Sequence, residues 1–145
     1  MMEKIRFKEF VSELKRGIDN CIIVKDRDVM RFSQPGVKSL LSILGEAPGK
    51  LNGSSVFDTI VGKGAAALMI LGGVEEVYAE LISDHAIGLL ERFEVNYSYG
   101  KRVPYIENKA KNGLCPIESL ATTSDNPQEI YRKILDFVSN ANKPA

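Results

Sequence analysis

Near the start of the chain, apolar residues recur at every third or fourth position. This spacing predicts a helix with one apolar face, formed by Phe7, Phe10, Val11, Leu14 and Ile18. Two short apolar runs follow, CIIVK at residues 21–25 and VMRFS at residues 29–33, and the polar residues between them favour a β-hairpin. The helical spacing then returns in a second predicted helix, whose apolar residues are Val37, Leu40, Leu41 and Leu44.

The middle of the chain is almost continuously apolar. Small residues in the stretch that begins at Val56 predict a buried helix from about Gly62 to Leu71, which Gly72 and Gly73 would end.

Two strands with a helix between them are predicted next. The strand segments are VEEVYAELI at residues 74–82 and VNYSY at residues 95–99, and Ser83 is a favourable N-cap for the intervening helix DHAIGLLERF. Pro104 donates no backbone hydrogen bond, so residues 102–106 are predicted to be an extended segment rather than a central strand.

The clearest helix start lies near the C-terminus, where Asn126, Pro127 and Glu129 fit the N-cap, N1 and N3 positions. The apolar face of this helix comprises Ile130, Ile134, Phe137, Val138 and Ala141. The predicted order is helix, hairpin, helix, helix, strand, helix, strand, short helix, helix. It indicates a single α/β domain over residues 1–145, a three-layer α/β/α sandwich whose mixed sheet has an N-terminal hairpin and later parallel strands.

Composition limits the partners. The 145 residues include 19 Lys and Arg and 19 Asp and Glu, so no basic surplus indicates a nucleic-acid partner. The first 17 residues lack the apolar core of a signal peptide, and the longest apolar run, residues 65–74, is shorter than the ~20 residues that span a bilayer. We therefore expect a cytoplasmic protein without a membrane partner. The two cysteines, Cys21 and Cys115, form neither a disulfide framework nor a closely spaced metal motif.

The Gly62-Lys63-Gly64 triplet invites comparison with a phosphate-binding loop. A Walker motif needs glycine where Phe57 stands, and Ser or Thr after the lysine, so the motif is incomplete. Backbone N–H groups at a helix start, with Lys63 beside them, still favour an anion. The alternative, which is compatible with the first, is that Gly64 and Ala65 to Ala67 let the helix pack closely on the sheet. Asp58 could orient Lys63 or hold a polar ligand, or it could cap the helix or form an ordinary surface pair.

The motif Cys115-Pro116-x-Glu118 fits the N-cap, N1 and N3 positions of a short helix. A helix start favours a reactive thiolate, whereas the nearby carboxylate opposes it, so a functional thiol and a buried inert thiol both remain open for Cys115. His85 is the only histidine and is predicted to lie on the surface. Tyrosines 97, 99 and 105 are predicted to pack at the sheet edge rather than to stack on bases.

The segments FDTIVGKGAAALMI, GGVEEVYAELIS, VNYSY, VPYI and LCPIE, in this order, resemble an uncharacterised bacterial family of unknown function with a cytidine deaminase-like fold. The resemblance extends from about Phe7 to Phe137. In active zinc deaminases of this fold, a His (or Cys)-x-Glu motif opens one core helix and Pro-Cys-x-x-Cys opens the next. The matching positions here are Lys63-Gly64-Ala65 and Ser83-Asp84-His85-Ala86. They lack the ligands and the catalytic glutamate, so we expect no metal and no cofactor.

Two functional hypotheses follow from this resemblance. In the first, the chain binds a small anionic or nucleotide-like ligand, with or without a reaction. Lys63 would bind the anionic group, Asp58 would orient it, Ser83 would line the site, and Cys115 and Glu118 would form the opposite wall. In the second, the chain is a non-catalytic interaction module or a homo-oligomer. An RNA-related role has only fold analogy behind it.

Overall fold

Five strands form one mixed sheet in the computed structural model, which describes residues 2–34 and 36–141. The strands are β1 (Cys21–Lys25), β2 (Asp28–Phe32), β3 (Ser55–Val61), β4 (Glu76–Ser83) and β5 (Asn96–Val103). Their order across the sheet is β2-β1-β3-β4-β5. β1 pairs antiparallel with β2 and with β3, whereas β3, β4 and β5 are parallel. The predicted mixed sheet with an N-terminal hairpin is confirmed.

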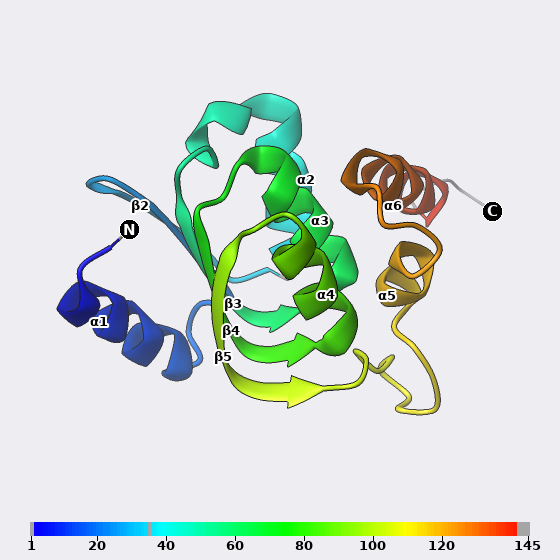
Figure 1. The fold of residues 1–145 in the computed structure, drawn as a ribbon, viewed down its shortest axis with the longest axis horizontal. Coiled ribbons are helices and arrows are strands. Elements are labelled where there is room, and N and C mark those ends of the chain that lie inside the picture. Colours follow the sequence, from blue (N-terminus) through cyan, green and yellow to red (C-terminus); the bar gives the residue numbers. More distant parts are fainter. Residues whose placement is uncertain (1, 35, 142–145) are drawn as a thin grey trace.

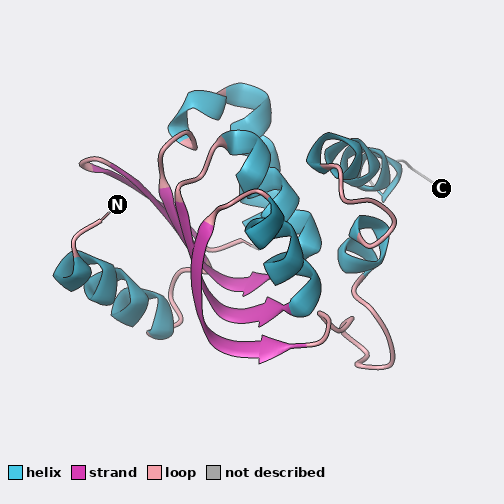
Figure 2. Ribbon diagram, in the orientation of Figure 1, coloured by secondary structure: helices cyan, strands magenta, loops and turns pink. Residues whose placement is uncertain are grey.

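Helices cover both faces of this sheet (Figure 1). One face carries α1 (Lys4–Lys15), and the other carries α2 (Gly36–Glu46), α3 (Lys63–Gly72) and α4 (Asp84–Arg92). A short 3-10 helix, η1 (Pro48–Lys50), follows α2. α5 (Pro116–Ala121) and α6 (Pro127–Ala141) pack on α3, on its side away from the strands (Figure 2). The predicted three-layer sandwich therefore carries an additional outer layer. Within the described residues, no helix combines the length and apolarity that crossing a bilayer requires.

The central strand β3 was missed by the sequence prediction. Residues 55–58 of this strand are all buried, because β3 lies between β1 and β4 and helices cover both of its faces. A strand that is buried on both faces lacks the alternation of apolar and polar residues. Its pattern therefore merges with that of α3 in the sequence. The first helix was also predicted too long: α1 ends at Lys15, and Ile18 is 77% exposed.

Aromatic rings join α1 to the sheet. The ring centroids of Phe7 and Phe10 lie 5.0 and 5.4 Å from that of Phe57 on β3. Tyr78 on β4 meets Phe7 edge to face at 6.0 Å. Aromatic pairs in such tilted arrangements stabilise a fold beyond the area they bury. This aromatic cluster holds α1 on the first face.

The second face of the sheet is organised around α3, whose residues 63–69 are all buried. The sheet, α2, α4, α5 and α6 surround this helix, and its small residues allow their close approach. A Cβ atom added to Gly64 would lie 2.5 Å from Cγ2 of Ile117, so α5 packs directly against the bare backbone. Gly64 therefore permits close packing, although its near neighbours belong to α5 and α6 and not, as was predicted, to the sheet. This packing does not compete with a role for Lys63 beside it.

The docking of α6 on α3 can be tested with two adjacent residues. Ile134 is fully buried, whereas Leu135 is 38% exposed. Ile134→Ala should lower the free energy of unfolding by about 2–5 kcal/mol, because it leaves a cavity between α6 and α3. Leu135→Ala should cost under about 1 kcal/mol. Urea unfolding of both variants measures the difference, and equal losses would contradict the packing described above.

Candidate functional site

The carboxylate of Glu118 is buried at the start of α3 and accepts three hydrogen bonds. Its Oε1 accepts from the backbone N–H of Lys63 at 2.7 Å and from the hydroxyl of Ser83 at 3.2 Å. Its Oε2 accepts from the backbone N–H of Ile106 at 2.7 Å. Only 1% of Glu118 is exposed, so these donors replace the water that the carboxylate gives up. The first turn of α3 thus has an internal anion.

Three separate elements bring these donors together. Ser83 ends β4 and caps α4, because its Oγ accepts from the N–H of Ala86 at 3.1 Å, as predicted. Ile106 follows β5, and its carbonyl accepts from the N–H of Cys115 at 2.8 Å, which closes the intervening loop at the start of α5. Gly62 leaves room for the carboxylate, since an added Cβ would lie 3.1 Å from Oε1 of Glu118.

The side chain of Lys63 leads away from Glu118 to a second carboxylate. Its Nζ lies 2.7 Å from Oδ1 of Asp125 in the α5–α6 connection, and Nη1 of Arg92 lies 3.8 Å from Oδ2. The Lys63 side chain is 7% exposed, whereas that of Asp125 is 60% exposed. The hydrogen bond from Lys63, its charge and the charge of Arg92 together lower the pKa of Asp125.

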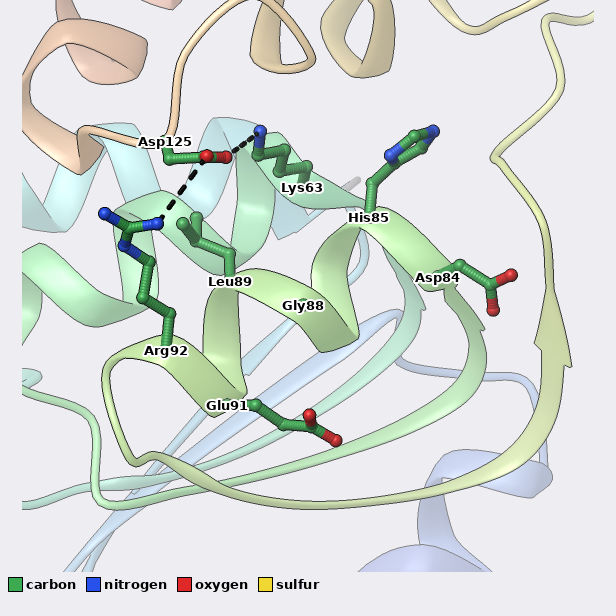
Figure 3. Close-up of a pocket in the computed structure, with 8 residues that line it drawn as sticks. All are labelled: Lys63, Asp84, His85, Gly88, Leu89, Glu91, Arg92 and Asp125. Atoms are coloured by element: carbon green, nitrogen blue, oxygen red, sulfur yellow. Dashed lines mark hydrogen bonds and ion pairs between the residues drawn. The ribbon is translucent and has the colours of Figure 1, made fainter.

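Beside this ion pair, α4 borders a hollow of about 540 Å³, which we call the α4 hollow (Figure 3). Its lining includes Lys63, Asp125 and the α4 residues His85, Leu89 and Arg92. The α4 carboxylates that also line it have other partners, since Asp84 pairs with Arg102 and Glu91 accepts a hydrogen bond from Tyr97. The two cations that line the hollow, Lys63 and Arg92, both face Asp125, whereas Asp84 and Glu91 bond to residues of β5.

The structure brings together some of the predicted site residues. Lys63, Ser83 and Glu118 meet, although through the backbone of Lys63, and Glu118 belongs to the centre of the contact rather than to an opposite wall. Cys115 begins α5 and is partly buried, but its side chain makes no capping hydrogen bond. Asp58 lies apart from them on β3, so it does not orient Lys63, whose partner is Asp125.

Among the described residues that line the α4 hollow, only Lys63 was predicted as a site residue, and the missed ones include Asp125, Arg92 and His85. Asp125 directly precedes the α6 N-cap Asn126, so its sequence context indicates only a turn. Arg92 occupies the last turn of α4, where a basic residue is favourable for the helix dipole. His85 was predicted as a surface residue, and it is exposed. No sequence signal joined these residues to Lys63, because their proximity depends on how α6 packs on α3.

Asp58 is 2% exposed and faces the start of α2. Its Oδ2 has no hydrogen-bond partner among the described residues, and a Cβ added to Gly36 would lie 2.0 Å from that oxygen. Burial raises the pKa of Asp58 to about 7, although the backbone N–H groups of Thr59 and Ile60 oppose the shift. Burial also raises the pKa of Cys21, its partner on β1, and the charge of Asp58 adds to that effect.

The residues at the two helix starts do not fit a zinc ion. At the start of α3, the carboxylate oxygens of Glu118 already accept three hydrogen bonds. At the start of α4, Asp84 pairs with Arg102. In the part of the chain that the structure describes, no group of three His, Cys, Asp or Glu side chains could hold a metal ion. The two helix starts therefore offer no set of zinc ligands among the described residues.

The model of a family described as TM1506, domain of unknown function (DUF1893), matches residues 9–138. The chain belongs to this family. A crystal structure of a DUF1893 family protein from Thermotoga maritima is similar with a TM-score of 0.84 and 25% identity, over 94% of this chain and 92% of that one. The predicted resemblance is thus confirmed. A comparison with curated proteins gives no match.

Solved deaminases share the fold at lower identity. The apo dCMP deaminase from the cyanophage S-TIM5 has a TM-score of 0.53 and 14% identity, over 70% of this chain and all of that one (100%). Its complex with dCMP and dUMP has a TM-score of 0.51 and 14% identity, over 68% and 99% of the two chains. These similarities confirm the cytidine deaminase-like fold.

Replacing the buried carboxylate of Glu118 by an amide tests its structural role. Glu118→Gln should lower the free energy of unfolding by about 2 kcal/mol or more, because the new NH₂ group would face a hydrogen-bond donor. Glu107→Gln is the matched control, since Glu107 is exposed in the preceding loop and should change stability by under about 0.5 kcal/mol. Urea unfolding measures both. If Glu118→Gln unfolded with the same free energy as the wild type, the three hydrogen bonds described for Glu118 would be contradicted.

The raised pKa of Asp58 predicts a pH dependence of stability. The folded state holds the Asp58 proton up to pH about 7, whereas the unfolded state loses it near the ordinary value of 3.8. The folded state therefore binds more protons between these values, and this residue's contribution to stability falls by about 1.4 kcal/mol per pH unit as pH rises, levelling off above pH 7.

Urea unfolding from pH 5 to 8 measures this effect. Asp58→Asn should flatten the decline between pH 5 and 7, whereas Asp136→Asn, at an exposed position of α6, should retain the wild-type slope. The same slope in Asp58→Asn and wild type would show that the carboxyl titrates normally.

Proposed function

We propose that the chain binds a small anionic ligand, such as a nucleotide-like phosphate, in the α4 hollow. The observation that carries this proposal is the position of Lys63. Its side chain is almost fully buried, yet its ammonium group reaches the hollow and meets a carboxylate that is largely exposed. A buried ammonium group needs an opposite charge nearby. Here that charge is an exposed carboxylate on a connecting turn, and an external anion can take its place.

Two further features support an anion at this position. Arg92 lies 3.8 Å from the other oxygen of Asp125, so a bound anion could face two cations. The backbone N–H of Lys63 already donates to Glu118, so the part of Lys63 that is offered to a ligand is its ammonium group. The predicted roles of Asp58, Cys115 and Ser83 in binding are not part of this proposal.

A nucleotide is the first candidate ligand. The cyanophage deaminase with the same fold was solved in complex with dCMP and dUMP, which makes dCMP a reasonable probe here. The hollow offers the exposed imidazole of His85 next to the cations, a group that suits a ligand with more than a phosphate. The proposal concerns binding, and it assigns no catalytic residue.

The proposal is tested by titrating the protein with dCMP and with inorganic phosphate. Lys63→Met keeps the apolar stem of Lys63 and removes its charge, so it should weaken binding about tenfold or more, since hydrogen bonds to charged groups contribute about 1.5–3 kcal/mol. Lys38→Met, at an exposed position of α2, should leave binding unchanged. Calorimetry measures the affinities, and thermal unfolding checks that each variant is folded.

Two outcomes would overturn this proposal. The first is the absence of binding of both probes to the wild-type protein at millimolar concentration, which would favour the alternative of an interaction module or homo-oligomer. The second is equal affinity of wild type and a folded Lys63→Met variant.

A further inference from the structure

Lys63 is held at two points by the C-terminal part of the chain. Its backbone N–H donates to Glu118 of α5, and its ammonium group pairs with Asp125 of the α5–α6 connection. The first contact is buried, whereas the second includes a carboxylate that is 60% exposed. The two contacts therefore differ in how readily water or a dissolved anion can compete for them.

Among the described residues, the hydrogen bonds at the start of α6 involve Ser124 and Asn126 and not the carboxylate of Asp125. Asn126 caps this helix, because its Oδ1 accepts from the N–H groups of Gln128 and Glu129 at 2.9 and 3.3 Å. Ser124 supports the same turn, with its Oγ accepting from the N–H of Asn126 at 3.0 Å. The carboxylate of Asp125 instead pairs with Lys63 and Arg92, on two other helices (Figure 3).

The hydrogen bonds that start α6 therefore do not depend on the carboxylate of Asp125. Ser124 and Asn126 supply the local hydrogen bonds, so α6 can begin without the charge of Asp125. The carboxylate of Asp125 places a negative charge next to the two cations of the α4 hollow. The side chain of Lys63 is 7% exposed, so its ammonium group needs an opposite charge nearby, and Asp125 supplies this charge from a carboxylate that is 60% exposed and within reach of water and dissolved anions.

We propose that Asp125 is an internal competitor for the anion site, and that a bound phosphate-type anion displaces it from Lys63 and Arg92. This inference rests on the proposed function, because it requires that an anion binds in the α4 hollow. While Asp125 occupies the cations, only the fraction of molecules with a displaced Asp125 is ready to bind, and the measured affinity is reduced by that fraction.

The displacement has a local structural consequence. Once Asp125 leaves Lys63, the turn at residues 123–126 loses its tie to α3 and α4, while the turn's own bonds at Ser124 and Asn126 remain. Glu118 still holds α5 on α3. Anion binding should therefore increase the mobility of the turn without separating α5 from α3.

The test compares Asp125→Asn with Asp136→Asn, a matched control at an exposed position of α6. Inorganic phosphate and dCMP serve as probes. Asp125→Asn should bind them about two- to fivefold more tightly than wild type, the range expected for removing an ion pair with one exposed partner. Asp136→Asn should bind like wild type. Residue-level amide exchange should be faster at residues 123–126 in unliganded Asp125→Asn and in anion-saturated wild type, and unchanged in α5.

The outcomes separate this inference from the proposed function. Binding to both proteins with equal or weaker affinity in Asp125→Asn would overturn the competitor role and leave anion binding in place. Binding to Asp125→Asn alone would support the competitor role in its strongest form. Absence of binding to both proteins would overturn the two proposals together. Unchanged exchange at residues 123–126 on anion binding would contradict displacement.

Discussion

The hydrogen bonds to the buried carboxylate of Glu118 hold three distant parts of the chain at one point. The start of α3, the N-cap of α4 and the segment after β5 each contribute one donor. A buried charge is costly unless such donors surround it, so each of these elements has to occupy its place for the others to be stable. The negative charge also suits the start of α3, where the helix dipole and free N–H groups favour an anion. Loop, helix and sheet are therefore positioned together.

The same contact determines which chemistry is left for a ligand. In many proteins a helix start with small residues and free N–H groups binds an external anion. Here the carboxylate of Glu118 occupies that position. The cations left for an external anion are the ammonium group of Lys63 and the guanidinium group of Arg92. A deaminase-like fold is thus combined with a polar centre of different composition. The fold itself carries no function, and the side chains at the helix starts make the difference.

Local chemistry was sufficient to predict most elements but not the pairs between them. The helix starts at Ser83, Pro116 and Asn126 follow from capping preferences, and all three are present. Glu118 was placed correctly in the first turn of α5, yet its partner Lys63 lies 55 positions upstream, beyond any periodicity or spacing rule. The pairing of Lys63 with Asp125, 62 positions away, was missed for the same reason. β3 was missed because burial on both faces removes the alternation by which a strand is recognised.

Asp58 and Glu118 illustrate why a polar residue in an apolar stretch is hard to interpret from sequence. Both carboxyl groups are almost completely buried, at 2% and 1% exposure. Glu118 is surrounded by donors from three elements, whereas one oxygen of Asp58 has no hydrogen-bond partner among the described residues. A carboxyl group without enough donors avoids the cost of a buried charge by keeping its proton, and the raised pKa of Asp58 expresses this. The donors that distinguish the two residues are contributed by the tertiary structure. A buried acid therefore indicates a polar centre only after its donors have been found.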